Sequence, residues 1–206
     1  MREKLEQYLA ILLEVNAHTN LTAIRQPEEI RVRHFEDSIK LLDAADFTGK
    51  TVLDVGSGAG FPGLVLKIAE PSISLTLLDA TEKKVRFLQR VCDELELSDV
   101  TCLHGRAEEL AHNPKYREKF DIVTARGVAA LPALCEICLP FIKVGGYSLF
   151  MKERAEDFSE AEKFGGVQES PCLYTLSDGR NHAVCRFRKV KPTPEKYPRP
   201  WGRIKG

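Results

Sequence analysis

The fold of this chain is decided by the stretch Asp54-Val55-Gly56-Ser57-Gly58-Ala59-Gly60-Phe61-Pro62-Gly63. An apolar run at 51–53 leads into it, and a helix-compatible run at 64–69 follows. This order predicts a buried strand, a glycine-rich turn and a helix, which together form the first βα unit of a nucleotide-binding sheet. Glycines in the turn allow a ligand to approach the backbone without meeting a Cβ atom.

The acidic residue at the start of this turn favours one class of ligand over another. The spacing Gly58-x-Gly60-x-x-Gly63 alone suits a dinucleotide. We expect Asp54, however, at the mouth of the turn, where its carboxylate would repel a pyrophosphate and attract a cationic ligand. S-adenosylmethionine carries a sulfonium and an ammonium but no phosphate. Together with Asp79 at the end of the next strand, Asp54 favours a methyltransferase that uses this cofactor.

Strands and helices alternate after Lys50, which predicts an α/β fold with a parallel, doubly wound sheet. We expect strands near 51–55, 74–79, 100–104, 120–124 and 146–151, and helices near 61–69, 82–95, 130–139 and 155–164. Two further runs, 167–176 and 181–190, flank an Asp-Gly turn and predict a hairpin. A mostly parallel, seven-stranded sheet that ends in an antiparallel hairpin is typical of class I (Rossmann-like) methyltransferases rather than dehydrogenases.

Two helices are expected before the sheet. Apolar residues between Leu5 and Leu13 have helical spacing, and Pro27 opens a second helix that runs to about Asp43. Four prolines make regular structure unexpected beyond Val190. We therefore predict a single domain over 1–206, with an N-terminal helical cap (1–49), a cofactor-binding core (50–190) and a basic, proline-rich tail (191–206).

Composition predicts an ordinary soluble protein, since 43% of the residues are hydrophobic and 29% are charged. No run is long enough for a membrane span and the N-terminus lacks the apolar core of a signal peptide, so we expect a cytoplasmic monomer with no membrane partner. The cysteines are scattered through apolar segments. Even the Cys135-x-x-Cys138 pair is expected to pack as two small hydrophobic side chains, with no metal bound.

The net charge of zero conceals an asymmetry along the chain. Residues 186–206 carry eight basic residues and one acidic residue, a net charge of +7, and residues 1–185 therefore carry −7. A basic tail on an acidic body indicates a polyanionic partner, although a merely solvated tail explains the same pattern.

Polar residues follow the second and third strands at the edge where ligands of open α/β sheets bind. Asp79 is placed to accept hydrogen bonds from a ribose, and the backbone at Ala107 and Glu108 to bind the polar edge of an adenine. Each has a simpler interpretation, because Asp79 could cap the helix near Glu82, and Gly105-Arg106-Ala107-Glu108 could be an ordinary helix start.

Three further residues are candidates for chemistry or RNA binding. Arg126 ends the fourth strand and could hold the cofactor carboxylate, a guanine O6 or a phosphate, unless it is a surface arginine paired with an acid. Lys152 follows the fifth strand and could bind a phosphate or be solvated. His34 shares a helix face with Asp37 and Ser38, where a structurally satisfied histidine is the simpler interpretation.

At this point the chain resembles the RsmG family, also called glucose-inhibited division protein B. The motifs that carry the resemblance span nearly the whole chain in order: Asn20-Leu21-Thr22, His34-x-x-Asp37-Ser38, the stretch 52–63 with its Gly-Phe-Pro-Gly ending, Leu77-Leu78-Asp79, Lys84-Val85-Arg86-Phe87-Leu88, Gly105-Arg106-Ala107-Glu108, Thr124-Ala125-Arg126, Tyr197-Pro198-Arg199 and a terminal Gly-x-x-Lys. The chain departs from the family pattern at Gly127, where alanine is usual, and at Glu153, where glycine is usual.

The resemblance implies an enzyme that methylates guanine N7 in 16S rRNA, in the decoding-region loop, with S-adenosylmethionine as methyl donor. It implies cofactor contacts at Gly56, Phe61, Ala107, Glu108 and Arg126, to which we add Asp54, Gly58, Gly60 and Asp79. We expect Arg126 and Lys152 to serve catalysis, and His34, Lys152, Arg199 and Arg203 to contact 16S rRNA or an assembling small subunit.

Other functions remain open on the sequence alone. They are a methyltransferase that acts on a small molecule or on another RNA, a dinucleotide-dependent oxidoreductase, and an RNA-binding protein without activity.

Overall fold

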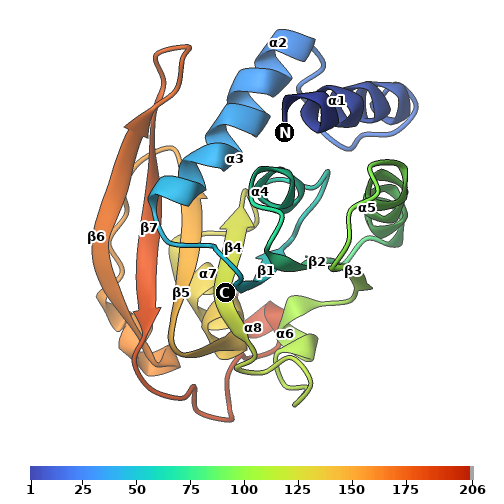
Figure 1. The fold of residues 1–206 in the computed structure, drawn as a ribbon. Coiled ribbons are helices and arrows are strands. Elements are labelled where there is room, and N and C mark those ends of the chain that lie inside the picture. The colour runs from blue at the N-terminus through green and yellow to red at the C-terminus, as the bar shows by residue number, and fades with distance from the viewer. Residues whose placement is uncertain (205–206) are drawn as a thin grey trace.

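A seven-stranded sheet lies at the centre of the computed structural model, which describes residues 1–204 (Figure 1). Its strands are β1 (Thr51–Val55), β2 (Ser74–Asp79), β3 (Val100–His104), β4 (Phe120–Arg126), β5 (Ile142–Lys152), β6 (Gly166–Thr175) and β7 (Asn181–Lys189). Their order in the sheet is β3-β2-β1-β4-β5-β7-β6. β1 to β5 are parallel, whereas β7 runs antiparallel to both β5 and β6.

The direction of chain progression reverses between β1 and β4, which lie side by side at the middle of the sheet. Because β1, β2, β3 and β4 are parallel, their carboxyl ends meet at one edge. Ligands of open α/β sheets bind at this edge, beside the point of reversal.

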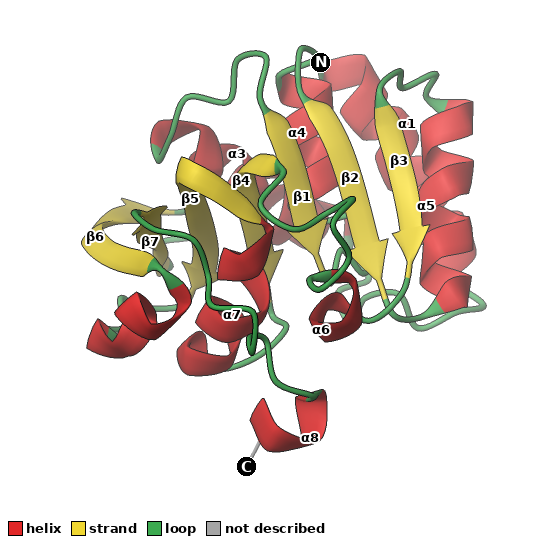
Figure 2. Ribbon diagram, turned by 90° about the horizontal axis from the view of Figure 1, so that it is seen from below, coloured by secondary structure: helices red, strands yellow, loops and turns green. Residues whose placement is uncertain are grey.

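Helices cover both faces of the sheet (Figures 1 and 2). One face carries α1 (Arg2–Asn16), α2 (Pro27–Ile30), the π-helical turn η1 (Arg31–Glu36), α3 (Asp37–Ile39), the 3-10 turn η2 (Lys40–Asp43), α4 (Gly63–Ala69) and α5 (Glu82–Glu94). The other face carries α6 (Ala107–Leu110), α7 (Leu131–Cys138), η3 (Leu139–Phe141), η4 (Ser159–Phe164) and α8 (Trp201–Ile204).

Alternation along the strands divides the core between these two layers. On β1, for example, Val52 packs against the layer of α1 and α4, whereas Leu53 and Val55 pack against the layer of α7. This is the period of two expected for a strand that is buried on both faces.

The segment 27–43 is helical throughout, although its geometry changes from α to π, back to α and then to 3-10. A π-helical turn shifts the side chains that follow it around the helix axis, and such turns are frequent at functional sites. Here it contains His34 and ends just before Asp37, both of which are buried.

The last fifteen described residues fold back onto the face of α7. The ammonium of Lys189 is fully buried and donates to the carbonyl oxygen of Leu139 and the hydroxyl of Thr193, both at 2.6 Å. Burial lowers the pKa of Lys189 to about 8, although Glu118 opposes the shift. Further along, the Tyr197 ring packs edge-on against Phe164. The tail is therefore a packed part of the molecule.

The structure confirms the α/β class, the mostly parallel sheet, the two N-terminal helical segments and the hairpin. Two predictions were wrong. Only a 3-10 turn at Ser159–Phe164 forms where a helix over 155–164 was expected, and α8 forms beyond Val190, where no regular structure was expected. The boundaries at 49/50 and 190/191 stay predictions, and Lys205 of the basic tail lies outside the described residues.

Cys135 and Cys138 are free and fully buried in α7, and burial raises the pKa of both thiols. They pack as small hydrophobic side chains, as predicted. Within residues 1–204, none of the helices has the length and apolar character needed to span a bilayer.

Candidate functional site

Asp54 lies beneath the glycine-rich turn and not at its mouth, which corrects the placement expected from the sequence. Its side chain is fully buried. One carboxylate oxygen accepts a hydrogen bond from the Thr124 hydroxyl at 2.9 Å, and the other accepts from the backbone N–H of Gly63 at 3.2 Å. Burial raises the pKa of Asp54 to about 6, against the opposing effect of these hydrogen bonds. Asp54 therefore fastens the turn to β4. It lines neither of the two cavities that are described below.

The Gly-Phe-Pro-Gly ending allows this arrangement. A Cβ atom on Gly63 would lie 2.9 Å from the nearer Asp54 carboxylate oxygen and 2.5 Å from a methyl carbon of Leu77, so only glycine fits. Phe61, which is also buried, packs with the rings of Tyr8 and Phe35 in the N-terminal helices. The Asp54 carboxylate and the aromatic cluster of Tyr8, Phe35 and Phe61 therefore both hold the turn in place.

Asp79 does reach the ligand-binding edge. Its carboxylate accepts hydrogen bonds from the backbone N–H groups of Gly58 at 2.9 Å and Thr81 at 2.8 Å, so it ties the turn to the start of α5. It also lines a cavity of about 200 Å³ between the ends of β1, β2 and β3. Thr81, and not Asp79, is the N-cap residue of α5, so the capping alternative is wrong in its residue, and the contact of Asp79 with a ribose stays a prediction.

The smaller cavity also contains three of the other predicted cofactor residues, Gly56, Ala107 and Glu108. The N–H groups of Ala107 and Glu108 donate to no backbone or side-chain acceptor within residues 1–204. Gly58, Gly60 and Phe61 do not line this cavity, and they shape the turn that forms its wall. Trp201 of α8 also lines this cavity.

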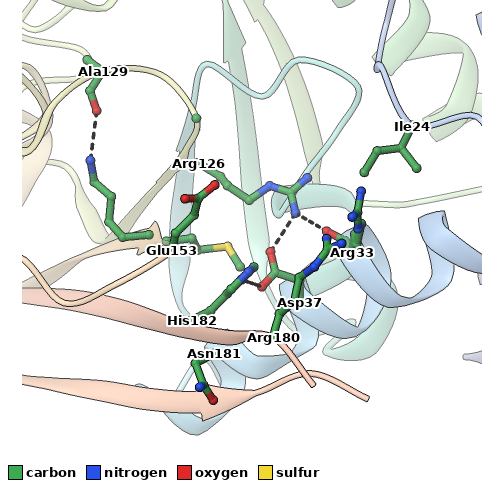
Figure 3. A pocket seen from close by; sticks show the side chains of 12 residues that line it. Ile24, Arg33, Asp37, Arg126, Ala129, Glu153, Arg180, Asn181 and His182 are labelled. Carbon is green, nitrogen blue, oxygen red and sulfur yellow. Dashed lines mark hydrogen bonds and ion pairs between the residues drawn. The ribbon is translucent and has the colours of Figure 1, made fainter. Parts of the chain in front are cut away.

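Arg126 forms the centre of a hydrogen-bonded network at the end of β4 (Figure 3). Its guanidinium donates to the Asp37 carboxylate and to the Arg33 carbonyl oxygen, both at 2.9 Å, and lies 5.3 Å from the centre of the Phe61 ring. Asp37 in turn accepts from the Tyr174 hydroxyl at 2.7 Å and lies 2.8 Å from Nδ1 of His182. The alternative interpretation was that Arg126 lies at the surface and pairs with an acidic residue. An acidic partner, Asp37, is present, but it is buried.

His34 belongs to the same network but is only 8% exposed. Its ring stacks on Phe61 at 4.3 Å, its Nδ1 lies 2.6 Å from the Arg126 guanidinium, and its Nε2 lies 2.9 Å from the Thr22 hydroxyl. Burial, together with the charge of Arg126, lowers the pKa of His34 to about 3. The ring is therefore neutral at physiological pH and supports Arg126, and its burial leaves little surface for the RNA contact we predicted.

A larger cavity of about 730 Å³ opens beside Arg126 (Figure 3). Four basic side chains and two acidic ones line it: Arg33, Arg126, Lys152, Arg180, Asp37 and Glu153. The ammonium of Lys152 donates to the carbonyl oxygen of Ala129 at 3.2 Å and lies 3.6 Å from Glu156. Gly127 and Ala129 line this larger cavity, and Val128 between them lines the smaller one, so the two cavities share one wall.

The basic residues of the tail have different environments. Arg199 makes two hydrogen bonds through its side chain, at 2.8 and 2.7 Å, to the buried carboxylate of Glu136 in α7. Burial would raise the pKa of Glu136, but Arg199 outweighs it and holds that pKa below its usual range. Arg199 therefore anchors the tail, whereas the side chain of Arg203 is exposed.

Sequence reasoning missed Tyr174, His182 and Trp201. The first two lie on the two strands of the hairpin and are directly paired in the register of β6 and β7. That register was implied by the Asp-Gly turn, but nothing in the sequence connects this pair to Asp37. Trp201 stood in a segment expected to lack structure.

Comparison with known proteins identifies relatives over nearly the whole chain. The family described as GidB, rRNA small subunit methyltransferase G, matches residues 1–170. A protein named ribosomal RNA small subunit methyltransferase G from Lachnoclostridium phytofermentans is 43% identical over 210 residues, which cover 98% of this chain and 86% of the relative. Its namesake from Alkaliphilus oremlandii is 44% identical over 210 residues, covering 97% and 87%.

Solved structures share the fold at low identity. The crystal structure of TrmN from Thermus thermophilus has a TM-score of 0.57 and 21% identity, covering 74% of this chain and 48% of that protein. A SAM-dependent methyltransferase from Aquifex aeolicus has a TM-score of 0.54 and 18% identity, covering 78% and 93%. These similarities bear out the class I methyltransferase architecture.

Proposed function

The chain belongs to the rRNA small subunit methyltransferase G family, and we propose that it transfers a methyl group from S-adenosylmethionine to N7 of a guanine in 16S rRNA. One observation carries the proposal. A small cavity suited to adenosine adjoins a larger, predominantly cationic one, and Arg126 stands beside their common wall. We place the modified guanine in the decoding-region loop, as the family resemblance implies.

The residues around the smaller cavity fit the adenosine part of the cofactor. Asp79 offers a carboxylate for ribose hydroxyl groups. The backbone N–H groups of Ala107 and Glu108 are available for an acceptor on the adenine edge. Gly56 adds a wall without a side chain. The cofactor, when bound, supplies an activated methyl group on a sulfonium.

The charge of the larger cavity supports an RNA substrate. Four basic side chains around one opening attract a phosphate backbone, and a neutral small molecule has no need of them. Arg180 contributes from the hairpin turn and Arg33 from the N-terminal cap, so the cationic rim spans both sides of the opening. We propose that Lys152, which is one of these four, binds a phosphate, and that Arg203 of the tail adds to the same attraction.

Methylation at N7 requires no removal of a proton, because N7 carries an exposed lone pair. The protein must hold N7 in line with the methyl group and exclude water, which is a contribution of position and orientation. Positive charge moves to the guanine ring during the transfer. Asp37 and Glu153, which line the larger cavity, are placed to stabilise that charge.

Within this scheme Arg126 orients the cofactor carboxylate or the base, and Asp37 and His34 fix its guanidinium in place. We further propose that the active form is a monomer. We also propose that the enzyme works in the cytoplasm and that its substrate is 16S rRNA or an assembling small subunit.

The test is transfer of labelled methyl from S-adenosylmethionine to 16S rRNA and to small-subunit particles lacking this modification. The product is then cleaved chemically at 7-methylguanine to map the position. We expect one labelled guanine in the decoding region. Label in a different RNA, or only in small molecules, would contradict the proposed substrate, and the absence of cofactor binding would contradict the proposed chemistry.

A further inference from the structure

The end of the tail reaches the cavity that fits adenosine. Trp201, the first residue of α8, lines this cavity together with Gly56 and Asp79, which lie at the ends of β1 and β2. It also lies beside α6, since the Arg106 guanidinium is 5.6 Å from the centre of the indole ring. Figure 2 shows the path of the chain from β7 past α7 to α8.

The tail is fastened at several points before it reaches this position. Arg117, in the loop before β4, donates to the carbonyl oxygens of Thr193 at 2.8 Å and Tyr197 at 3.0 Å. The Arg199–Glu136 pair, two residues before Trp201, adds a bidentate interaction with a buried carboxylate. Such anchors fix the backbone, so the indole is held at the cavity at little further cost in conformational entropy.

The chemistry of the indole suits one part of the cofactor. Adenine is a flat aromatic base, and aromatic side chains bind bases by stacking whatever their hydrogen-bonding pattern. Ala107 and Glu108 are placed to meet the polar edge of the base, and Trp201 adds an aromatic surface to the same cavity. Arg106 links Glu108 to Trp201, because its guanidinium pairs with the Glu108 carboxylate at 2.9 Å and lies over the indole ring.

We propose that Trp201 is a cofactor-binding residue, which closes the adenosine cavity and stacks on the adenine base. The inference rests on the proposed function, because it concerns the same cofactor. It assigns to the C-terminal tail a part in cofactor binding, in addition to any contact with RNA.

Trp201 is the only tryptophan in the chain, so its fluorescence reports on this position alone. The full-length protein is titrated with S-adenosylhomocysteine, the demethylated product, and tryptophan emission is followed. Adenosine and methionine are titrated separately. We expect S-adenosylhomocysteine and adenosine to change the emission and methionine to leave it unchanged. No change with S-adenosylhomocysteine, when calorimetry shows that it binds, would overturn the inference.

Two substitutions test the stacking contact by calorimetry. Trp201→Ala should weaken S-adenosylhomocysteine binding roughly tenfold, whereas Trp201→Phe, which keeps an aromatic ring, should stay within about threefold of the parent. Ile204→Ala serves as the matched control, because it truncates a partly buried side chain of the same helical turn that does not line this cavity. It should leave the dissociation constant unchanged.

The outcomes separate this inference from the proposed function. If the parent protein binds the cofactor and Trp201→Ala binds it equally well, the inference is wrong and the proposed function stands. If Trp201→Phe binds S-adenosylhomocysteine as weakly as Trp201→Ala does, the proposed stacking on adenine is wrong. If the parent protein binds neither S-adenosylmethionine nor its product, the proposed function fails, and the inference fails with it.

Discussion

Arg126 shows how one side chain can be held firmly and still face a cavity. Its partner Asp37, which is buried, also interacts with Tyr174 and His182, so the carboxylate cannot turn away without losing all three partners. The neutral ring of His34 fills the remaining side. The result is a cation whose position is set by residues from both ends of the chain.

We expect Arg126→Ala to reduce methyl transfer by roughly 100-fold or more, because the loss affects both orientation and the charge that the cavity presents. Arg126→Lys keeps the charge but not the planar, two-pronged geometry and should recover only part of the rate. Turnover with labelled cofactor is the measurement, and thermal unfolding confirms that the variants fold. Full turnover by the alanine variant would remove Arg126 from the mechanism.

His34 should make stability sensitive to acid. Its folded-state pKa of about 3 lies below the ordinary value of 6.5, so the unfolded chain takes up a proton first as the pH falls. Stability is therefore unaffected above about pH 7 and decreases from there toward pH 3. Asp54 acts in the opposite direction, because its raised pKa of about 6 favours the folded state below that pH.

Comparison with His34→Gln isolates the histidine, since Asp54 is present in both proteins. Between pH 7 and pH 5 the parent should lose roughly 1–2 kcal/mol more stability than the glutamine variant. Urea unfolding at the two pH values measures the difference. Equal acid losses in both proteins would show that His34 titrates normally in the folded state.

At the scale of elements, the glycine-rich turn is a joint between three parts of the molecule. β1 supports it through Asp54, β2 through Asp79, and α1 through Tyr8, whose hydroxyl donates to the carbonyl oxygen of Ala59. The turn cannot shift without disturbing the N-terminal cap. Cap and cofactor site therefore form one unit.

The sequence was sufficient for most elements because their signals are local. Periodicity and glycine placement predicted β1 to β4, the N-terminal helices and the hairpin. The position of the Asp54 carboxylate was not predicted, because it depends on which face of β1 the side chain takes and on Thr124 across the sheet. α8 was missed for a similar reason, since a proline-rich segment gains its structure from anchors as distant as Glu136.

Gly60 tests how tightly the turn is packed. Its φ is +98°, and a Cβ atom there would lie 2.5 Å from the Tyr8 hydroxyl oxygen and still closer to Leu64. Gly60→Ala should destabilise the protein by roughly 2–4 kcal/mol, the sum of left-handed strain and overpacking. Gly49→Ala is the matched control, with a φ of +65° and no atom near its Cβ, and should cost about 1–2 kcal/mol. Denaturant unfolding measures the free energy of unfolding of both variants. Equal losses would mean that the turn relaxes to accommodate the added methyl group.

Over the whole molecule, much of the +7 charge counted over residues 186–206 is already engaged in ion pairs. Arg186 and Arg188 pair with Glu169, Lys189 with Glu118, and Arg199 with Glu136. Lys191, Lys196 and Arg203 are exposed and have no acidic partner within residues 1–204. Fewer residues of this segment are therefore free to attract RNA than its net charge of +7 indicates.

Replacing Lys196 and Arg203 together with glutamine should therefore reduce the slope of log affinity against log salt for rRNA binding. The expected reduction is roughly 0.7–0.9 for each phosphate that the variant no longer neutralises. The double variant Lys50→Gln with Lys119→Gln removes the same charge before β1 and β4, at the opposite edge of the sheet, and should leave the slope unchanged. Binding is measured over a series of salt concentrations. Equal slopes in the two double variants would place the RNA elsewhere.

The contacts of Asp37 with Tyr174 and His182 bear on how the enzyme matures during synthesis. A nascent chain that has extruded only its cap and β1 to β4 carries the glycine-rich turn but has nothing from the hairpin to complete the arginine site. Ribosome-bound chains that have extruded fewer than about 182 residues should therefore be unable to methylate rRNA. Activity would begin only after both strands of the hairpin have left the ribosome.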